Sequence, residues 1–323
     1  MTRGRLPNAA VAALRERFGD RLRELEPLAR YTSARIGGPA DVVIVAGSID
    51  ELAEAAMVLW HSQLPLRVLG GGSNVLVSDA GVRGAVILNQ ARDVKFRKQA
   101  GRESVHAESG AVLGSVARRA VEKGLSGIEW AATVPGTVGG AVVGNAGAHG
   151  GDVAGSLEMA EILQRDGSVV HWSADELDYA YRDSRLKRSP GEAVVLSADF
   201  RLVLSTVEAT KARTAEFVAH RQSTQPPGAS WGSMFKNPPG DHAGRLIEAA
   251  GLKGAREGDV EISTQHGNFF INRGRARASD AWAMITRVQA AVEATTGVRL
   301  ELEVELLGDW QGHPAGTGAG AQD

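Results

Sequence analysis

The chain lacks cysteine altogether in its 323 residues. Disulfides, thiolate nucleophiles, iron–sulfur clusters and cysteine-ligated zinc are therefore excluded. An excess of charge of one sign is also missing, because 36 Lys and Arg stand against 38 Asp and Glu, with both signs mixed along the sequence. No basic footprint for nucleic acid or for an anionic membrane follows from such a balance, and we expect neither as a partner.

Long apolar runs are absent too. No stretch of the sequence reaches the roughly 20 apolar residues of a membrane span. Residues 1–30 have the pattern of a charged amphipathic helix and lack the apolar centre of a secretory signal. The histidines show no metal-ligand interval such as HExxH, so we expect no metal. These absences favour a cytoplasmic protein, which we also expect to be a monomer.

Glycine, by contrast, is abundant, with 40 residues, and one run of the chain is dominated by it. Residues 127–151 read GIEWAATVPGTVGGAVVGNAGAHGG. Small residues offer few side chains for packing, and glycine permits backbone angles and close approaches that other residues do not. Free N–H groups in such turns form cradles for anions such as a pyrophosphate. The run therefore predicts a ligand lying against bare backbone.

A second glycine run lies upstream, where an expected strand at 66–69 leads into Gly70, Gly71 and Gly72, then Ser73 and Asn74. Neither run matches GxGxxG or the P-loop, because we expect no helix directly after the glycines. Each run taken alone is equally well explained as a tight hairpin turn. The presence of both favours two phosphate-binding loops.

The hydrophobic pattern predicts an α+β chain. Helices are expected at 49–62, 112–123, 205–220, 242–250 and 279–296, with a further helix start at 173–176. Strands are expected at 42–46, 66–69, 82–89, 103–108, 160–165, 168–172, 194–204, 268–272 and 298–307. We place a domain boundary near Ser205, which gives a helical segment at 1–30, domains at 31–204 and 205–310, and a frayed tail at 311–323.

Two segments carry candidate chemistry in loops. Ser233, in GSMFKNP, has a hydroxyl that can donate a proton to a carbon acid, with the nearby Lys236 favouring the alkoxide. Arg182, in YRDS, has a planar guanidinium that suits a substrate carboxylate. The alternatives are a serine in an ordinary turn and a surface arginine paired with Asp183.

Near the C-terminus, LELEVEL alternates so that Glu301, Glu303 and Glu305 share one strand face. A solvated face is the simpler interpretation, and periodicity does not choose which glutamate would be catalytic. Among the histidines, His266, with Asn268 just before an expected strand, is the most site-like, although ordinary packing also explains it.

Taken in series, eight segments between about residues 32 and 308 resemble the UDP-N-acetylenolpyruvoylglucosamine reductases, flavoenzymes of bacterial peptidoglycan synthesis. The segments are TSARIGGPAD, LGGGSNVLVSD, GIEWAATVPGTVGGAVVGNAGAHG, YRDSRLK, GSMFKNP, AGLKG, HGNFFIN and LEVELLG. The resemblance implies a two-subdomain FAD-binding region of the vanillyl-alcohol-oxidase (PCMH) type at 31–204, followed by a smaller α+β substrate-binding domain at 205–310.

The resemblance also implies non-covalent FAD, with NADPH as co-substrate. The implied FAD-binding residues are Gly70, Gly71, Gly72, Ser73, Asn74, Val75, Pro135, Gly136, Thr137, Val138, Gly139, Gly140, Asn145, Ala146, Gly147 and Ala148. These residues belong to the two glycine runs that predicted a ligand on bare backbone.

For the reaction, the resemblance implies reduction of UDP-N-acetylglucosamine enolpyruvate to UDP-N-acetylmuramate. By similarity, Ser233 donates the proton, while Arg182 and Glu303 flank the substrate carboxylate, which selects one of the three glutamates. Further expected substrate contacts are Tyr181, Lys236, Asn237, His266 and Asn268.

The sequence departs from part of the family in two places. The short path from 194 to 220 leaves no room for the inserted loop with a lid tyrosine, so the chain resembles the loop-lacking type II subtype. Thr224 stands where other members have a lysine, and Lys236 is a candidate substitute. The competing interpretations are another FAD-dependent oxidase or dehydrogenase of the same fold, and a non-catalytic nucleotide-sugar or phosphate-binding module.

Overall fold

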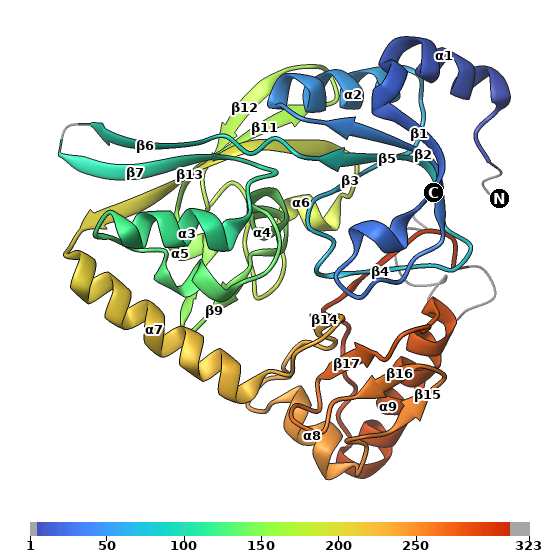
Figure 1. Cartoon of the computed structure of the whole chain (residues 1–323), viewed down its shortest axis with the longest axis vertical. Coiled ribbons are helices and arrows are strands. Elements are labelled where there is room, and N and C mark those ends of the chain that lie inside the picture. The colour runs from blue at the N-terminus through green and yellow to red at the C-terminus, as the bar shows by residue number, and fades with distance from the viewer. Residues whose placement is uncertain (1–4, 100, 311–323) are drawn as a thin grey trace. The chain divides into compact units, whose positions relative to one another are not determined.

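The computed structural model describes residues 5–99 and 101–310 (Figure 1). Its contacts divide the chain into two compact units. Among the described residues, the first unit comprises 5–43, 72–85 and 224–310, and the second comprises 44–71, 86–99 and 101–223. This division differs from the predicted boundary near Ser205, because N-terminal segments group with the C-terminal part. The predicted tail at 311–323 lies outside the described residues.

The second unit is built on an antiparallel sheet in the order β12-β11-β13-β7-β6, with β8 pairing β13 at one side. Its core joins this sheet to α3 and α4, for example through Phe200, Val116 and Val138. The strands are β6 (Val94–Gln99), β7 (Arg102–Glu108), β8 (Leu125–Ser126), β11 (Leu157–Gln164), β12 (Val169–Trp172) and β13 (Ala193–Leu204). The helices are α2 (Ile49–His61), α3 (Leu113–Glu122), α4 (Val138–Gly144), α5 (Val153–Ser156) and α6 (Arg185–Arg188), followed by α7 (Val207–Thr224), whose last residue belongs to the first unit.

The first unit contains the sheet β14-β17-β16-β15, with α9 packed beside β15 and β16 (Figure 1). Its core includes Phe235 and Phe270, whose rings meet edge to face. The elements are α1 (Asn8–Phe18), β1 (Leu22–Pro27), β4 (Val75–Val77), β14 (Ser230–Ser233), α8 (Ala243–Ala249), β15 (Arg256–Glu257), β16 (Val260–Ile262), β17 (Phe269–Asn272), α9 (Ala278–Thr296) and β18 (Glu305–Leu307). A further sheet has the order β1-β2-β5-β3, where β3 is Leu66–Leu69. Strands β2 (Pro39–Ala46) and β5 (Val82–Asn89) each include residues of both units.

The α+β class is confirmed, and most predicted elements are present. Helix α2 begins at the predicted residue, and Ser48 caps it, with Ser48 Oγ accepting a bond from Glu51 N at 3.2 Å. Strand β6 was not predicted, because an edge strand with one exposed side carries little hydrophobic alternation. The predicted helix start at 173–176 is wrong. Ser173 N donates to Glu176 Oε2 and Glu176 N donates to Ser173 Oγ, as at the start of a helix, but the chain forms only a turn there.

Residues 1–30 are not one helix, since β1 follows α1 within that range. The predicted strand at 298–307 is also shorter than expected, because only β18 is regular strand. Both errors come from partners that the local pattern does not contain. Strand β1 joins a sheet beside β2, and β18 pairs in parallel with the distant β4.

The two glycine runs differ from their predicted local structure. Strands β3 (Leu66–Leu69) and β4 flank the first run but pair with β5 and β18, so the hairpin alternative is wrong. In the second run, α4 begins directly after Thr137, whose Oγ1 accepts from Gly140 N at 3.5 Å. The expectation that no helix follows the glycines is therefore wrong for this run.

Candidate functional site

In the second unit, the two glycine runs lie backbone against backbone. A Cβ added to Gly71 would stand 3.1 Å from Gly136 Cα, and one added to Gly70 would overlap Thr137 Oγ1. A Cβ on Gly139 would meet Ser109 Cβ at 2.9 Å. These glycines are needed because side chains would force the loops apart. The structure thus brings together two loops that the sequence predicted separately.

The remaining predicted cofactor residues continue from these loops. Val75 opens β4, and Ser73 and Asn74 precede it; Val138, Gly139 and Gly140 form the first turn of α4. Asn145 ends that helix at φ 44°, in the left-handed region, and Ala146 leads into β9 (Gly147–Ala148). Strand β9 pairs with β10 (Gly151–Asp152).

Arg182 lies against this second loop. Its guanidinium donates from Nη2 to Gly147 O at 2.9 Å and from Nη1 to Asn145 O at 3.5 Å. Asn145 Nδ2 in turn donates to Ala180 O at 3.0 Å. The YRDS segment and the NAGA segment are therefore fastened together within one unit. Tyr181 is 54% exposed, and Asp183 forms its ion pair with Arg188.

The residues of these loops fit a bound dinucleotide. Where the loops meet, Gly71 stands against the main chain of Gly136, and Gly70 stands against the side chain of Thr137. Bare peptide groups at such turns suit a pyrophosphate, which needs N–H donors and no bulky side chains. No metal is needed for this fit, and among residues 5–99 and 101–310 no group of three or more potential metal ligands occurs.

In the first unit, Ser233 ends β14 at an irregular point of the sheet. Ser230 faces Ile271 and Ser233 faces Phe269, with a register shift between them. Gly232, just before the serine, has φ 75°, a conformation that strains other residues. A bulge of this kind re-aims the side chain that follows it. The local sequence Gly-Ser thus explains how the hydroxyl leaves the regular strand pattern.

Glu303 is joined to the same segment through the main chain. Glu303 N donates to Met234 O at 2.9 Å, and Asn74 Nδ2 donates to Glu303 O at 3.0 Å. Glu305 N also donates to Asn74 O at 3.0 Å. Asn74, the GSMF turn and the LEVEL segment therefore meet in one hydrogen-bonded network of the first unit.

The three glutamates do not share one environment, contrary to the alternation read from the sequence. The Glu301 side chain is 76% exposed and pairs with Lys236 at 3.5 Å, while Glu303 is half-buried. The chain bends at Val304, whose N also approaches Met234 O at 3.5 Å. The regular strand that the alternation predicted therefore does not run through all three glutamates.

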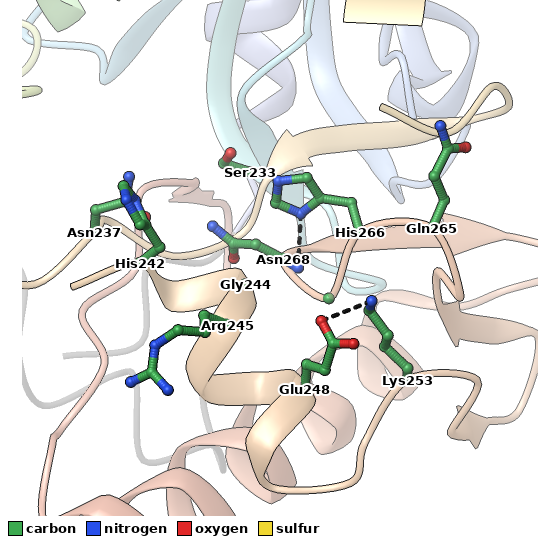
Figure 2. A pocket seen from close by; sticks show the side chains of 11 residues that line it. Ser233, Asn237, His242, Gly244, Arg245, Glu248, Lys253, Gln265, His266 and Asn268 are labelled. Atoms are coloured by element: carbon green, nitrogen blue, oxygen red, sulfur yellow. Dashed lines mark hydrogen bonds and ion pairs between the residues drawn. The ribbon is translucent and has the colours of Figure 1, made fainter. Parts of the chain in front are cut away.

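A pocket of about 270 Å³ opens in the first unit beside Ser233 (Figure 2). Among the predicted residues, Ser233, Asn237, His266 and Asn268 line it. Its other lining residues were not singled out from the sequence: His242, Gly244, Arg245, Glu248, Lys253, Gln265 and Gly267. Lys253 lay inside the AGLKG segment, which was the one signal that pointed to it.

Burial favours the neutral form of the His266 side chain. Burial first, and then the charge of Lys253, lower the pKa of the His266 imidazole. Its Nδ1 accepts from Asn268 N at 3.1 Å, so the neutral ring carries its proton on Nε2 (Figure 2). His266 therefore supplies a neutral donor beside two cations, of which Lys253 pairs with Glu248 at 2.7 Å and Arg245 pairs with Asp241.

Asn237 and Asn268, two residues predicted to contact the substrate, use their side-chain amides to bond main-chain groups of the protein. Asn237 Oδ1 accepts from Ala243 N at 3.1 Å, at the start of α8. Asn268 is 2% exposed and holds the main chain of Phe235 with both ends of its amide. The predicted contact of Asn268 with substrate stays a prediction, but its observed bonds point to a structural task.

Comparison with known proteins identifies the class of protein to which the chain belongs. A family model described as FAD binding domain matches residues 40–173, which include both glycine loops. A second, described as UDP-N-acetylenolpyruvoylglucosamine reductase, C-terminal domain, matches residues 222–307, which include Ser233 and Glu303. The chain is thus an FAD-binding flavoprotein, as the resemblance implied.

Relatives define the family further. The chain is 46% identical over 284 residues to the UDP-N-acetylenolpyruvoylglucosamine reductase of Rubrobacter xylanophilus, covering 88% of this chain and 94% of the relative. It is 43% identical to that of Chloroflexus aggregans, covering 88% and 97%. The crystal structure of the Thermus caldophilus enzyme aligns with a TM-score of 0.73 at 36% identity, covering 87% and 97%. The chain belongs to the UDP-N-acetylenolpyruvoylglucosamine reductase family.

Of the described residues, none forms a helix with both the length and the apolar character needed to cross a membrane.

Proposed function

We propose that this protein reduces UDP-N-acetylglucosamine enolpyruvate to UDP-N-acetylmuramate for peptidoglycan synthesis, using bound FAD and NADPH. The observation that carries the proposal is the hydrogen-bonded network that joins Met234, next to Ser233, to Glu303, with Ser233 lining a polar pocket. Family membership supports the activity and the cofactor.

When bound, FAD would supply the hydride chemistry between NADPH and the enolpyruvyl group. The chain's own residues handle the proton and the developing charge. Ser233 Oγ donates a proton to the carbon beside the carboxylate. Arg182, as a cation, stabilises the carboxylate and the enolic charge. The Glu303 carboxyl group contributes in its protonated form, as a hydrogen-bond donor to the same oxygen, since fixed donors aimed at developing charge lower the barrier.

The pocket suits the charged, polar end of such a substrate. Lys253 and Arg245 place cations on its wall, and His266 adds a neutral donor. Phosphate oxygens accept from such groups. We propose that Asn237 and His266 contact the substrate here, and that Lys236 and Tyr181 contribute further contacts. A contribution from Asn268 would come from the same pocket wall.

Four further expectations belong to the proposal: the location, the oligomeric state, the partners and the domain division. The cytoplasm is the proposed location and the monomer the proposed state, with no partner other than NADPH and the sugar nucleotide. Cofactor and substrate domains at 31–204 and 205–310 remain our proposed division. The matched family models, 40–173 and 222–307, support the order of these domains.

Anaerobic half-reactions test the function. Purified protein loaded with FAD should bleach when NADPH is added, and its colour should return when UDP-N-acetylglucosamine enolpyruvate follows without oxygen. Recolouring by oxygen or by a hydroxy acid alone would favour an oxidase or dehydrogenase. A colourless chain that takes up no FAD would favour a binding module.

A further inference from the structure

Asn268 holds the turn that carries Ser233. Its Oδ1 accepts from Phe235 N at 2.9 Å, and its Nδ2 donates to Phe235 O at 2.8 Å. Its own carbonyl accepts from Met234 N at 2.9 Å. The Asn268 side chain thus bonds both the N–H and the C=O of Phe235, and its main-chain carbonyl bonds the N–H of Met234. In a regular sheet, a neighbouring strand would bond these main-chain groups.

The same turn carries Glu303. Met234 O accepts from Glu303 N at 2.9 Å, and Lys236 N donates to Glu301 O at 2.8 Å. The turn at 234–236 therefore stands between Asn268 on one side and the 301–303 segment on the other. A shift of Met234 and Phe235 would displace the neighbouring Ser233 and the main chain of Glu303 together.

We propose that Asn268 is a positioning residue for the reaction, setting the Ser233 hydroxyl and Glu303 through the Met234–Phe235 main chain. The inference deepens the proposed function and rests on it. Asn268 acts through the turn, and its own contact with substrate is not required.

Asparagine suits this task because its amide offers an acceptor and a donor a short reach from the backbone. Phe235 is fully buried. Without the amide, the Phe235 N–H and C=O would stand unpaired in the core, and the turn would move to relieve that cost. A displacement of about 1 Å at a reacting group slows chemistry by about 100-fold.

Two substitutions separate this role from simple loss of packing. Asn268→Leu keeps the approximate size of the side chain but removes both bonds. Asn268→Asp keeps the acceptor for Phe235 N and faces Phe235 O with a group that donates only when protonated. Burial near a carbonyl raises the pKa of such a carboxyl, so the second bond should return as pH falls.

Asn272 provides the matched control. It is the last residue of β17, the strand that follows Asn268, and its side chain also bonds main chain. Nδ2 donates to Ala34 O at 2.9 Å, and Oδ1 accepts from Gly274 N at 2.8 Å and from Ala276 N at 3.2 Å. Asn272→Leu removes at least as many bonds at a place that does not hold the turn of Ser233. Its stability loss should therefore leave the reaction of the folded enzyme within about twofold of the unmodified chain.

The experiment follows FAD retention, melting temperature and the two anaerobic half-reactions of each holoenzyme. Asn268→Leu should slow the substrate half-reaction about 100-fold, raise its solvent deuterium isotope effect, and leave reduction by NADPH nearly unchanged. Asn268→Asp should be slow at neutral pH and recover rate on acidification, relative to the unmodified chain at each pH.

Equal slowing of both half-reactions by the Asn268 variants, or the same selective defect in Asn272→Leu, would overturn the proposal. If Asn268→Leu does not fold, the Asn268→Asp pH profile decides, and a profile parallel to that of the unmodified chain contradicts the inference. Failure of the unmodified holoenzyme to turn over the substrate would contradict the proposed function instead.

Discussion

Individual residues carry the proposed chemistry, and Ser233 is the first to test. Ser233→Ala should slow the substrate half-reaction by about 10²- to 10⁴-fold, the range for a lost general acid, and leave reduction by NADPH intact. Stopped-flow flavin absorbance measures both steps. Ser230→Ala, on the same strand, serves as the control and should be mild. Equal loss of rate in both half-reactions would contradict the role of Ser233 as the proton donor.

The glutamates differ in environment, and this gives a second prediction. Glu303→Gln should slow the substrate half-reaction at least about 10-fold, because an amide N–H is a weaker hydrogen-bond donor to developing negative charge than a carboxylic acid. Glu301→Gln should be within about twofold, since its exposed pair with Lys236 contributes little. Measuring the steady-state kcat of each variant tests both expectations. A severe defect in Glu301→Gln beside an active Glu303→Gln would move the catalytic carboxylate to Glu301.

His266 links pH to stability. Burial, and then Lys253, lower its pKa in the folded state, whereas an unfolded histidine titrates near about 6.5. As pH falls below that value, the unfolded chain takes up a proton that the folded chain resists, so stability declines until the lowered pKa is passed. His266→Asn should therefore flatten the fall in melting temperature between about pH 7 and 5.5. An unchanged or steeper slope would contradict this assignment.

At the scale of elements, Asp79 connects the LVSD segment to α9. Its Oδ1 accepts from Ala278 N at 2.8 Å and its Oδ2 from Ser279 N at 3.0 Å. Burial raises the pKa of Asp79, but these bonds outweigh it and hold the pKa below its usual value. Asp79 therefore takes the place of an N-terminal cap, supplied from the turn that follows β4.

Asp79→Ala should lower the free energy of unfolding by about 1–2 kcal/mol, the range for a lost helix cap. Asp79→Asn, which keeps one acceptor, should lose less. Urea denaturation at pH 7 measures both. Because the folded pKa is depressed, the contribution is present above the unfolded value of about 3.9 and is lost as pH falls through the folded one. A difference between the unmodified chain and Asp79→Ala that persists undiminished at pH 2 would contradict this explanation.

Pairing partners explain which elements were predictable. Helix α2 and strand β5 carry their signals within a few residues, as the Ser48 cap shows. Strand β18 depends on β4, more than 200 residues away in sequence, and the 173–176 segment stops as a turn despite a good capping pattern. Local propensity is a weak guide where a distant partner decides.

For the whole molecule, the bound cofactor should govern stability. The glycine loops at Gly71 and Gly136 lie against each other, and FAD that binds only the folded chain stabilises it by mass action, by about 2.7 kcal/mol at 100 times its Kd. Removing FAD should lower the melting temperature, and titrating it back should restore the original value. Thermal melts of FAD-free and reloaded protein measure this, and an identical melting temperature in both would contradict FAD binding by the folded chain.

The sequence by itself determined which chemistries are excluded by composition, where most helices and strands lie, and where the two glycine loops are. It also determined the family and its cofactor. Each of these depends on short patterns or on residue type. Only the tertiary structure decided that the loops meet at Gly71 and Gly136, that Glu301 and Glu303 differ, and that Asn268 holds the turn beside Ser233. These facts depend on contacts between segments far apart in the chain, and a side chain's partner across such a distance is set by packing, which no local pattern records.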